Sequence, residues 1–248
     1  EVEVVKRSLT NKIQKLIVES ITVMDGKLRY QINKNKLKVL LGLKIIKILR
    51  RSKFLLFIFE KNIVMLVHLG MTGKFFFINE KDIKYKTSFY YNVDNLKDNK
   101  HNKLIFLLSN KQKLIYNDVR KFGFIKILDR RKLKSNLHLK NLGPEPLGKS
   151  FNFKYFKNYL IDRNRTIKDI LMDQKFVSGL GNIYANEVLF LSKVKPTRKT
   201  HLIKDREIHK IIRNTKKTLK AAIFFGGSSL KDFSSSDGKK GKFQQHFH

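Results

Sequence analysis

The hydrophobic pattern changes in character along the chain. Residues 2–17 repeat an apolar side chain every three or four positions, with Lys and Arg between them, which predicts an amphipathic helix. From about residue 18 to 130, short apolar or alternating runs are broken by turn residues such as Asp25-Gly26 and Lys61-Asn62. These runs are ESITVMD, KLRYQI, LKIIKILRR, KFLLFIF, NIVMLVHLG, KFFFI, NKLIFLLS and QKLIYND. Many short strands at this spacing predict a β-sandwich or barrel.

Helical periodicity returns in the second half of the chain. Residues 166–176 and 182–193 predict two helices joined by the tight turn SGLGN, and residues 205–225 predict a longer helix. The segment NLGPEPLGKS holds two of the three prolines, which is typical of an interdomain linker. We expect an α+β protein with an N-terminal β-sandwich and flanking helices at 1–135, a linker at 136–150 and a helical domain at 151–248.

Composition points to a polyanionic partner. The 248 residues include 54 basic and 20 acidic side chains, a net charge of +34 spread over a globular pattern. Nucleic acid suits this field better than a membrane, because the basic residues do not form one amphipathic helix or tail. The alternative is a merely basic soluble protein. The absence of cysteine excludes disulfides and thiolate-ligated metal sites, and no apolar run is long enough to span a membrane.

Basic residues stand at the mouth of a predicted buried strand. Arg50, Arg51 and Lys53 precede the apolar run FLLFIF. Their stems can lie on apolar surface while the charged heads stay outside, where they can meet a phosphate. A strand end that only needs solubilising gives the same pattern, so both interpretations stand.

Two segments that contain glycine combine apolar and basic residues. HLGMTG places Met71 between two glycines, and RKFG places Phe122 beside Arg120 and Lys121. Glycine permits close backbone approach and unusual φ, so Met71 and Phe122 can project from turns and wedge into a base stack from which a nucleotide has been removed. The alternative is that each is an ordinary core residue.

The turn SGLGN is a candidate anion site. Its backbone amides, the N-terminus of the following helix and the Asn182 side chain suit a DNA phosphate. Tight helical turns also need glycine for their own geometry, so the pattern alone does not decide. Asp173 and Glu187 flank the turn, and catalysis, orientation of other groups and helix capping all remain open for them.

Taken together, these segments resemble the formamidopyrimidine-DNA glycosylase family, bifunctional glycosylases and AP lyases that remove oxidised purines such as 8-oxoguanine. The matching segments run in order over nearly the whole chain. They are EVEVVKRSL, RRSKFLL, HLGMTG, NDVRKFG, LGPEPL, IKDILMDQKFVSGLGNIYANE, GGSSLKDF and SDGK. The block from Leu171 to Glu187 is the most specific, because it is similar to the helix-two-turn-helix signature of the family.

The resemblance implies roles for residues of the first domain. Lys53 matches a lysine that contacts DNA at the lesion and assists the lyase chemistry, which favours the functional interpretation of this strand end. Met71, Arg120 and Phe122 match the trio that fills the gap left by the flipped nucleotide, with Arg120 pairing with the orphaned cytosine. Lys121 stands where the family commonly has a second arginine.

The resemblance also implies contacts to the DNA backbone. His101 matches a histidine that meets the backbone, and Lys168 and Asn182 match phosphate-facing positions of the helical domain. Glu187 matches a glutamate of the signature, without an assigned role. A mobile loop that closes over the extruded base is implied from Ser228 to Lys239. Its leading residues are Ser228, Ser229, Leu230, Lys231, Asp232 and Phe233.

Both ends depart from the family pattern. The family begins with a proline, whose amine is the nucleophile, and a glutamate that acts as acid and base, a few residues before the position of Glu1. Lys53 could form the imine instead if Arg50 and Arg51 lowered its pKa. The family also continues past FQQHF into a zinc-binding hairpin with four cysteines. We therefore expect truncation at both termini and no cofactor in this chain, with zinc only where the hairpin is present.

The leading hypothesis is a monomeric base-excision repair enzyme of the bacterial cytoplasm that acts on double-stranded DNA containing oxidised bases, with no membrane partner. One alternative is a non-catalytic protein that binds damaged DNA and has lost the nucleophile. Another is an endonuclease VIII-type glycosylase acting on oxidised pyrimidines. Met71, Arg120 and Phe122, together with the SSLKDF loop, favour the purine-specific branch.

Overall fold

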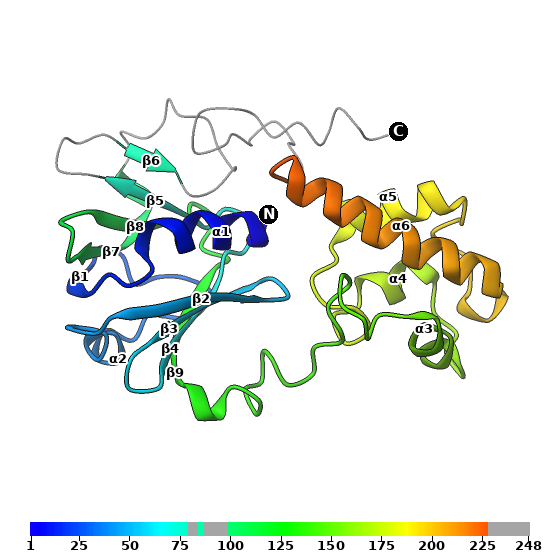
Figure 1. Cartoon of the computed structure of the whole chain (residues 1–248), viewed down its shortest axis with the longest axis horizontal. Helices are drawn as coiled ribbons and strands as arrows, with labels where there is room; N and C mark the ends of the chain where they lie inside the picture. Colours follow the sequence, from blue (N-terminus) through cyan, green and yellow to red (C-terminus); the bar gives the residue numbers. More distant parts are fainter. Residues whose placement is uncertain (79–83, 87–98, 228–248) are drawn as a thin grey trace. The chain divides into compact units, whose positions relative to one another are not determined.

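A computed structural model describes residues 1–78, 84–86 and 99–227 of the chain (Figure 1). The chain divides into two compact units, one containing Glu1–Lys134 and the other containing Ser135–Phe224. The first unit is built mainly of strands, and the described part of the second is helical. The predicted α+β class, a β-sandwich followed by a helical unit, is therefore confirmed.

Two antiparallel sheets form the first unit, in the orders β1-β7-β8-β5-β6 and β2-β3-β4-β9. The strands of the first sheet are β1 (Val18–Val23), β5 (Lys74–Ile78), β6 (Lys84–Lys86), β7 (Asn102–Leu108) and β8 (Lys113–Asn117). Those of the second sheet are β2 (Ile45–Arg51), β3 (Phe54–Phe59), β4 (Ile63–His68) and β9 (Phe124–Asp129). The chain crosses from one sheet to the other between β1 and β2, between β4 and β5, and again between β8 and β9.

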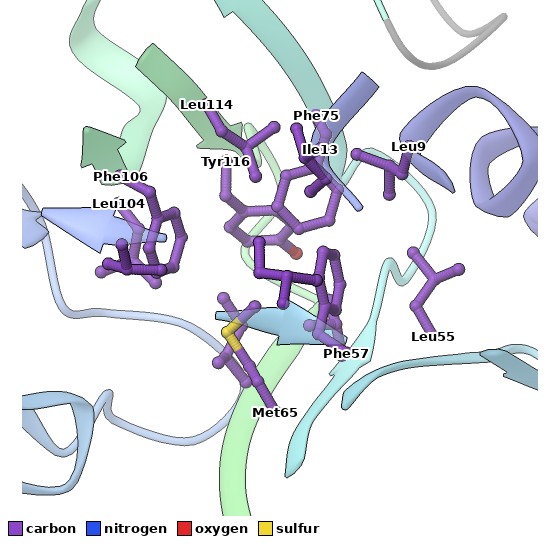
Figure 2. Packing of buried hydrophobic residues seen from close by; sticks show 14 of the residues in the cluster. Leu9, Ile13, Leu55, Phe57, Met65, Phe75, Leu104, Phe106, Leu114 and Tyr116 are labelled. Atoms are coloured by element: carbon purple, nitrogen blue, oxygen red, sulfur yellow. The ribbon is translucent and has the colours of Figure 1, made fainter. Parts of the chain in front are cut away.

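The core of the first unit lies between these sheets (Figure 2). Phe57 of one sheet meets Phe75 of the other with ring centroids 5.6 Å apart, and Phe75 lies 5.1 Å from the Tyr116 ring. Helix α1 (Val2–Ile13) adds Leu9 to the same cluster. Aromatic rings at these separations bury a large apolar area in a specific geometry, so they hold the sheets together.

Helix α1 is shorter than the apolar pattern predicts. It ends at Ile13, because Lys15 takes a left-handed φ of 74° and its N–H donates to the carbonyl of Ile45 over 2.7 Å. Ile17 instead forms an isolated bridge with Lys44. The apolar pattern continues beyond the helix because Leu16 packs against the core cluster and Val18 belongs to it.

The prediction of a strand at residues 27–32 is wrong. Its backbone groups are used in turn contacts: Ile32 N–H donates to Gly26 O over 2.9 Å, and Arg29 N–H donates to Gly123 O over 3.1 Å. These bonds replace a regular ladder, which needs a neighbouring strand. Strand β9, by contrast, is absent from the predicted runs, although it pairs with β4 along its whole length.

In the described part of the second unit, four α-helices follow one another. They are α3 (Phe153–Leu160), α4 (Ile167–Met172), α5 (Asn182–Ser192) and α6 (Asp205–Phe224). Thr166 caps α4 by accepting from Asp169 N over 3.2 Å. Helix α4 ends earlier than predicted, because Asp173 has extended backbone, and the turn that follows leads into α5. This is the helix-two-turn-helix arrangement that the sequence predicts.

The remaining helices are short. They are α2 (Lys34–Lys38), η2 (Asn99–His101), η3 (Arg130–Lys132) and η4 (Thr200–Leu202). Within the second unit, the segment predicted as a linker contacts the turn after α4: Gly143 N–H donates to Gln174 O over 2.8 Å, and Ser178 N–H donates to Pro144 O over 3.0 Å. These bonds tie the middle of residues 136–150 to the turn after α4.

Gly123 occupies a position where no side chain fits, and this gives a test of the fold. A Cβ there would lie 2.0 Å from Tyr116 Oη and 2.8 Å from the carbonyl oxygen of His68. Gly123→Ala should therefore destabilise the first unit by about 3 kcal/mol, measured by thermal or urea unfolding.

Gly26→Ala is the matched control for this substitution. A Cβ at Gly26 would meet its nearest atom only at 3.8 Å, and neither glycine has a left-handed φ. We expect its free energy of unfolding to stay within about 1 kcal/mol of the parent. Equal stability of the two variants would contradict the close packing around Tyr116.

Candidate nucleic-acid interface

Two neighbouring loops carry the predicted void-filling residues. Residues 69–73 link β4 to β5 and residues 118–123 link β8 to β9, and both cross from one sheet to the other. The crossings run side by side because β4 pairs with β9, His68 opposite Phe124, and β5 pairs with β8, Lys74 opposite Asn117. Met71, Arg120 and Phe122 therefore lie at the same end of the sandwich.

Met71 and Phe122 project from these loops. Met71 is 59% exposed and Phe122 is 45% exposed, which excludes the alternative that they are core residues. The Arg120 guanidinium lies 4.8 Å from the centroid of the Phe122 ring, within range of a cation–π contact. Two exposed apolar side chains and a stacked arginine are thus presented together.

The loops touch at backbone distance. Gly70 has a φ of 64°, and a Cβ there would lie 2.6 Å from the carbonyl carbon of Phe122. Beneath this contact, the Thr72 hydroxyl donates to Asp118 Oδ1 and accepts from Arg120 N–H over 3.0 Å. Asp118 Oδ2 accepts from Gly123 N–H over 2.8 Å. We call this set of bonds, centred on Thr72 and Asp118, the loop clamp.

Lys121 forms an ion pair within the protein. Its ammonium lies 3.2 Å from Asp25 Oδ2, and the ammonium of Lys103 lies 2.6 Å from the same oxygen. The hydrogen bond from Lys103, with further donors, holds the pKa of Asp25 well below its usual range. Sequence reasoning missed Lys103, which is fully buried in β7, and assigned Lys121 only to DNA. The one available signal was a lysine within an otherwise apolar strand.

Lys53 lies in the turn between β2 and β3 and is partly buried. Burial lowers the pKa of its ammonium, and the Glu1 carboxylate opposes that shift. The cause expected from the sequence, repulsion by Arg50 and Arg51, is therefore wrong, because desolvation accounts for the direction. An amine with a lowered pKa has a larger neutral fraction, and the neutral form is the one that attacks carbon.

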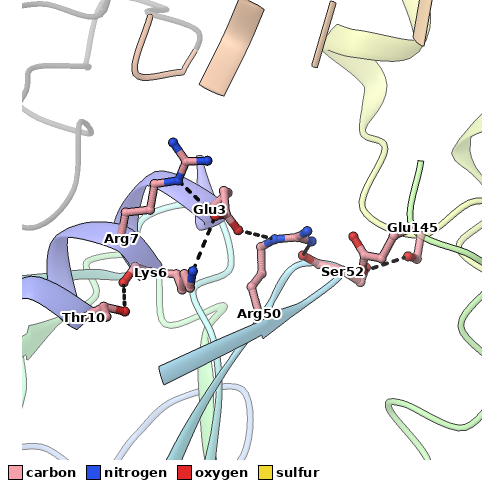
Figure 3. Close-up of polar contacts among 8 residues, drawn as sticks. Glu3, Lys6, Arg7, Thr10, Arg50, Ser52 and Glu145 are labelled. Carbon is pink, nitrogen blue, oxygen red and sulfur yellow. Dashed lines mark hydrogen bonds and ion pairs between the residues drawn. The ribbon is translucent and has the colours of Figure 1, made fainter. Parts of the chain in front are cut away.

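Arg50 is bound to the first helix (Figure 3). Its Nε donates to Glu3 over 2.9 Å and its Nη1 donates to the carbonyl of Ser52 over 3.0 Å. Glu3 also accepts from Arg7 over 3.1 Å and lies 3.7 Å from the Lys6 ammonium. Burial alone would raise the pKa of Glu3, but hydrogen bonds from Arg50 and Arg7 outweigh it and lower that pKa. This network fixes the β2–β3 turn that carries Lys53.

The predicted phosphate site of the second unit is an ordered turn. Gln174 holds it from both sides, since its Nε2 donates to Leu180 O over 2.8 Å and its Oε1 accepts from Gly179 N–H over 2.7 Å. Gly179 has a left-handed φ of 90°. Asn182 is the exposed first residue of α5, as predicted. Its side chain and its place at the N-terminus of α5 suit an anion.

The acidic residues near this turn divide into two kinds. Asp173 accepts from Lys175 N–H over 2.9 Å and from Arg165 over 2.8 Å, and these bonds outweigh burial and lower its pKa. Of the alternatives left open for Asp173, this geometry favours bracing of the turn. Glu187 is only 7% exposed, on the buried side of α5.

Lys168, the other predicted phosphate contact of the second unit, is half-buried on α4. Its backbone N–H donates to Pro196 O over 3.2 Å.

His101 lies close to the loop clamp, since its carbonyl accepts from Asp118 N–H over 3.1 Å. The predicted lesion loop falls outside the described residues. Its members are Ser228, Ser229, Leu230, Lys231, Asp232 and Phe233. The chain contains no cysteine, so it has no ligand for the four-cysteine zinc site that the resemblance implies. Within residues 1–78, 84–86 and 99–227, no group of three His, Asp or Glu could hold a metal ion, and no helix is long and apolar enough to cross a membrane.

Comparison with known sequences gives matches to both halves of the chain. A family model described as the formamidopyrimidine-DNA glycosylase N-terminal domain matches residues 1–125, and one described as the H2TH domain of the same enzymes matches residues 142–234. The formamidopyrimidine-DNA glycosylase of Rickettsia felis is 37% identical over 99% of this chain and 83% of its own length. That of Wolbachia pipientis subsp. Culex pipiens is 36% identical over 100% of this chain and 86% of its own length.

Solved structures agree with these matches. The complex of Lactococcus lactis Fpg with DNA containing an abasic site matches with a TM-score of 0.83 and 32% identity, covering 100% of this chain and 85% of the other. The complex of wild-type Lactococcus lactis Fpg with DNA containing N7-benzyl-Fapy-dG gives a TM-score of 0.83 at 31% identity over the same shares. Sequence matches along nearly the whole chain and a shared fold in both units thus show that the chain belongs to the formamidopyrimidine-DNA glycosylase family, the DNA glycosylases of base-excision repair.

Proposed function

We propose that this protein removes oxidised purines from duplex DNA and then cleaves the strand at the resulting abasic site. The observation that carries the proposal is the pair of loops that presents Met71, Phe122 and Arg120 at one end of the sandwich. Exposed apolar side chains on braced turns suit insertion into a base stack, and an arginine over the Phe122 ring suits the edge of the unpaired base.

The second unit supports the same proposal by its suitability for a phosphate backbone. Asn182 and the ordered turn before α5 present amide donors, and the chain carries a net charge of +34. Contacts of this kind position the protein on any duplex, whereas Arg120 reads a base. The Lactococcus lactis protein binds DNA containing an abasic site, which is consistent with a product complex of such a reaction.

The proposed chemistry needs an amine at the sugar. The amine attacks C1′ and displaces the base, the sugar ring opens to an imine, and elimination then breaks the strand. The resemblance assigns this amine to an N-terminal proline and assigns Lys53 an assisting role. Partial burial and a lowered pKa suit Lys53 to that role, beside the Glu1 carboxylate.

Borohydride trapping tests this proposal directly, because it reduces the imine to a stable cross-link. We expect a version extended by the family's N-terminal proline and glutamate and by its C-terminal hairpin to cross-link to a duplex carrying 8-oxoguanine opposite cytosine. If the 248-residue chain cross-links and its Lys53→Met variant does not, Lys53 is the amine that forms the imine. If both versions bind damaged duplex tightly and neither cross-links, the protein is a non-catalytic damage-binding protein. Cross-linking only to oxidised pyrimidines would give the endonuclease VIII-type activity.

Arg120→Ala should remove discrimination of the base opposite the lesion. Because a bidentate arginine contact discriminates between bases by about 1–3 kcal/mol, the preference for cytosine should fall by that amount. Binding to duplexes with each of the four opposing bases measures the effect. Arg206→Ala, on the exposed face of α6, removes the same charge and should keep the preference. An equal loss on all four duplexes would show that Arg120 contacts only the backbone.

Asn182→Ala should instead weaken binding to damaged and undamaged duplexes alike, because a phosphate contact carries no base information. The loss should be about 1.5–3 kcal/mol, the range for a hydrogen bond to a charged group. Fluorescence titration with both duplexes at several salt concentrations measures it, and affinity should fall steeply with salt. Asn158→Ala, exposed on α3, is the matched control. Selective loss on damaged DNA would place Asn182 at the lesion.

A further inference from the structure

The loop clamp joins the side chains that fill the gap to the one that reads the opposite base. Thr72 follows Met71 directly, and its hydroxyl bonds both the Asp118 carboxylate and the backbone amide of Arg120. Asp118 in turn accepts from Gly123, next to Phe122. We propose that Thr72 and Asp118 are positioning residues that make the two loops one rigid wedge. This inference rests on the proposed function.

The hydrogen-bonding capacity of the clamp is well used. A hydroxyl has a single proton to donate, and Thr72 gives it to Asp118 while accepting from Arg120 N–H. The carboxylate uses one oxygen for Thr72 and the other for Gly123 N–H. A substitution that removes the Thr72 hydroxyl takes a hydrogen-bond partner from both Arg120 N–H and Asp118 Oδ1.

Burial strengthens these bonds. Thr72 is 8% exposed and Asp118 is fully buried, so water does not replace a lost partner there. Hydrogen bonds to an ionised carboxylate are about twice as strong as neutral ones. Burial, and after it the Asp118 charge, raise the pKa of Tyr116 well above its usual range, which keeps this neighbouring hydroxyl neutral.

Loops that open a base stack must be rigid. Unstacking one base step costs a few kcal/mol, and a loop that bends under that cost leaves the base step closed. Each crossing alone is a short turn, and the described contacts beneath them run through Thr72 and Asp118. A shared clamp lets Met71 and Phe122 act on the DNA together and fixes the backbone from which Arg120 extends. Accurate reading of the opposite base therefore depends on a hydroxyl that does not contact DNA in this role.

Thr72→Val and Thr72→Ser form the matched pair that tests the inference. Val keeps the shape and removes the hydroxyl, whereas Ser keeps the hydroxyl. A duplex with a tetrahydrofuran abasic site opposite cytosine or adenine is the probe. The ratio of the two affinities should fall about tenfold or more in Thr72→Val, as expected for a misplaced reading group, and stay near the parent value in Thr72→Ser. Affinity for undamaged duplex should not change. An unchanged ratio in Thr72→Val overturns the inference.

A double variant tests whether the two residues act as one device. Asp118→Asn removes the charge but retains an oxygen that can accept from Gly123 N–H. If Thr72 and Asp118 work through one clamp, Thr72→Val/Asp118→Asn loses no more of the affinity ratio than the worse single variant. Independent, multiplying losses would contradict the clamp. Asp118→Asn also serves in place of Thr72→Val if melting curves show that the valine variant unfolds early.

A measurement without DNA separates this inference from the proposed function. The chain has no tryptophan, so Phe122→Trp supplies a single fluorescent reporter in the wedge. Its anisotropy in the free protein should fall when Thr72→Val is added and hold when Thr72→Ser is added. Unchanged anisotropy in the valine variant overturns the clamp whatever the DNA results. A parent that shows no preference between cytosine and adenine contradicts the proposed function while leaving the anisotropy test of the clamp intact.

Discussion

The close contact between two crossings of the sandwich is the constraint on which the rest of the candidate site depends. Pairing of β4 with β9 and of β5 with β8 brings residues 69–73 and 118–123 together at one end. Gly70 and Gly123 allow the backbones to approach to distances that a Cβ would block. Once the backbones lie this close, Asp118 is buried beneath them, and its charge requires donors from both loops. The packing of the two loops against each other therefore also places the wedge residues.

Elements of the fold were predictable where the chain repeats a strong local pattern. The apolar runs FLLFIF and IVMLVH became β3 and β4 because both their faces are buried. The run at 27–32 looks similar but folds into turns, since its amides bond Gly26 and Gly123 rather than a neighbouring strand. The end of α1 depended on Lys15 bonding Ile45, a contact between distant parts of the sequence. Local periodicity does not contain such contacts.

The candidate site, like the fold, was predictable only where a local sequence pattern marks it. Met71, Arg120 and Phe122 could be singled out from glycine-flanked segments, and their exposure agrees with that interpretation. The environment of each charge could not be foreseen. Lys121 shares Asp25 with Lys103, a buried lysine of β7 that belongs to neither loop. Lys53 owes its lowered pKa to burial instead of to the adjacent arginines. Charge interactions depend on distances between segments, which spacing along the chain does not give.

Three paired acidic residues order the turns in which predicted DNA contacts lie. Glu3, Asp25 and Asp173 each bind at least two donors, and together they order the β2–β3 turn, the Lys121 loop and the turn before α5. Asp25 contacts Lys121 directly, whereas Glu3 and Asp173 bind other cations and brace the turn that carries Lys53 and the turn that leads to Asn182. A carboxylate near a phosphate site would repel the ligand if it were exposed and unpaired. When the carboxylate is paired with lysine or arginine, its charge is offset locally, and the pair braces the turn in which the predicted contact lies.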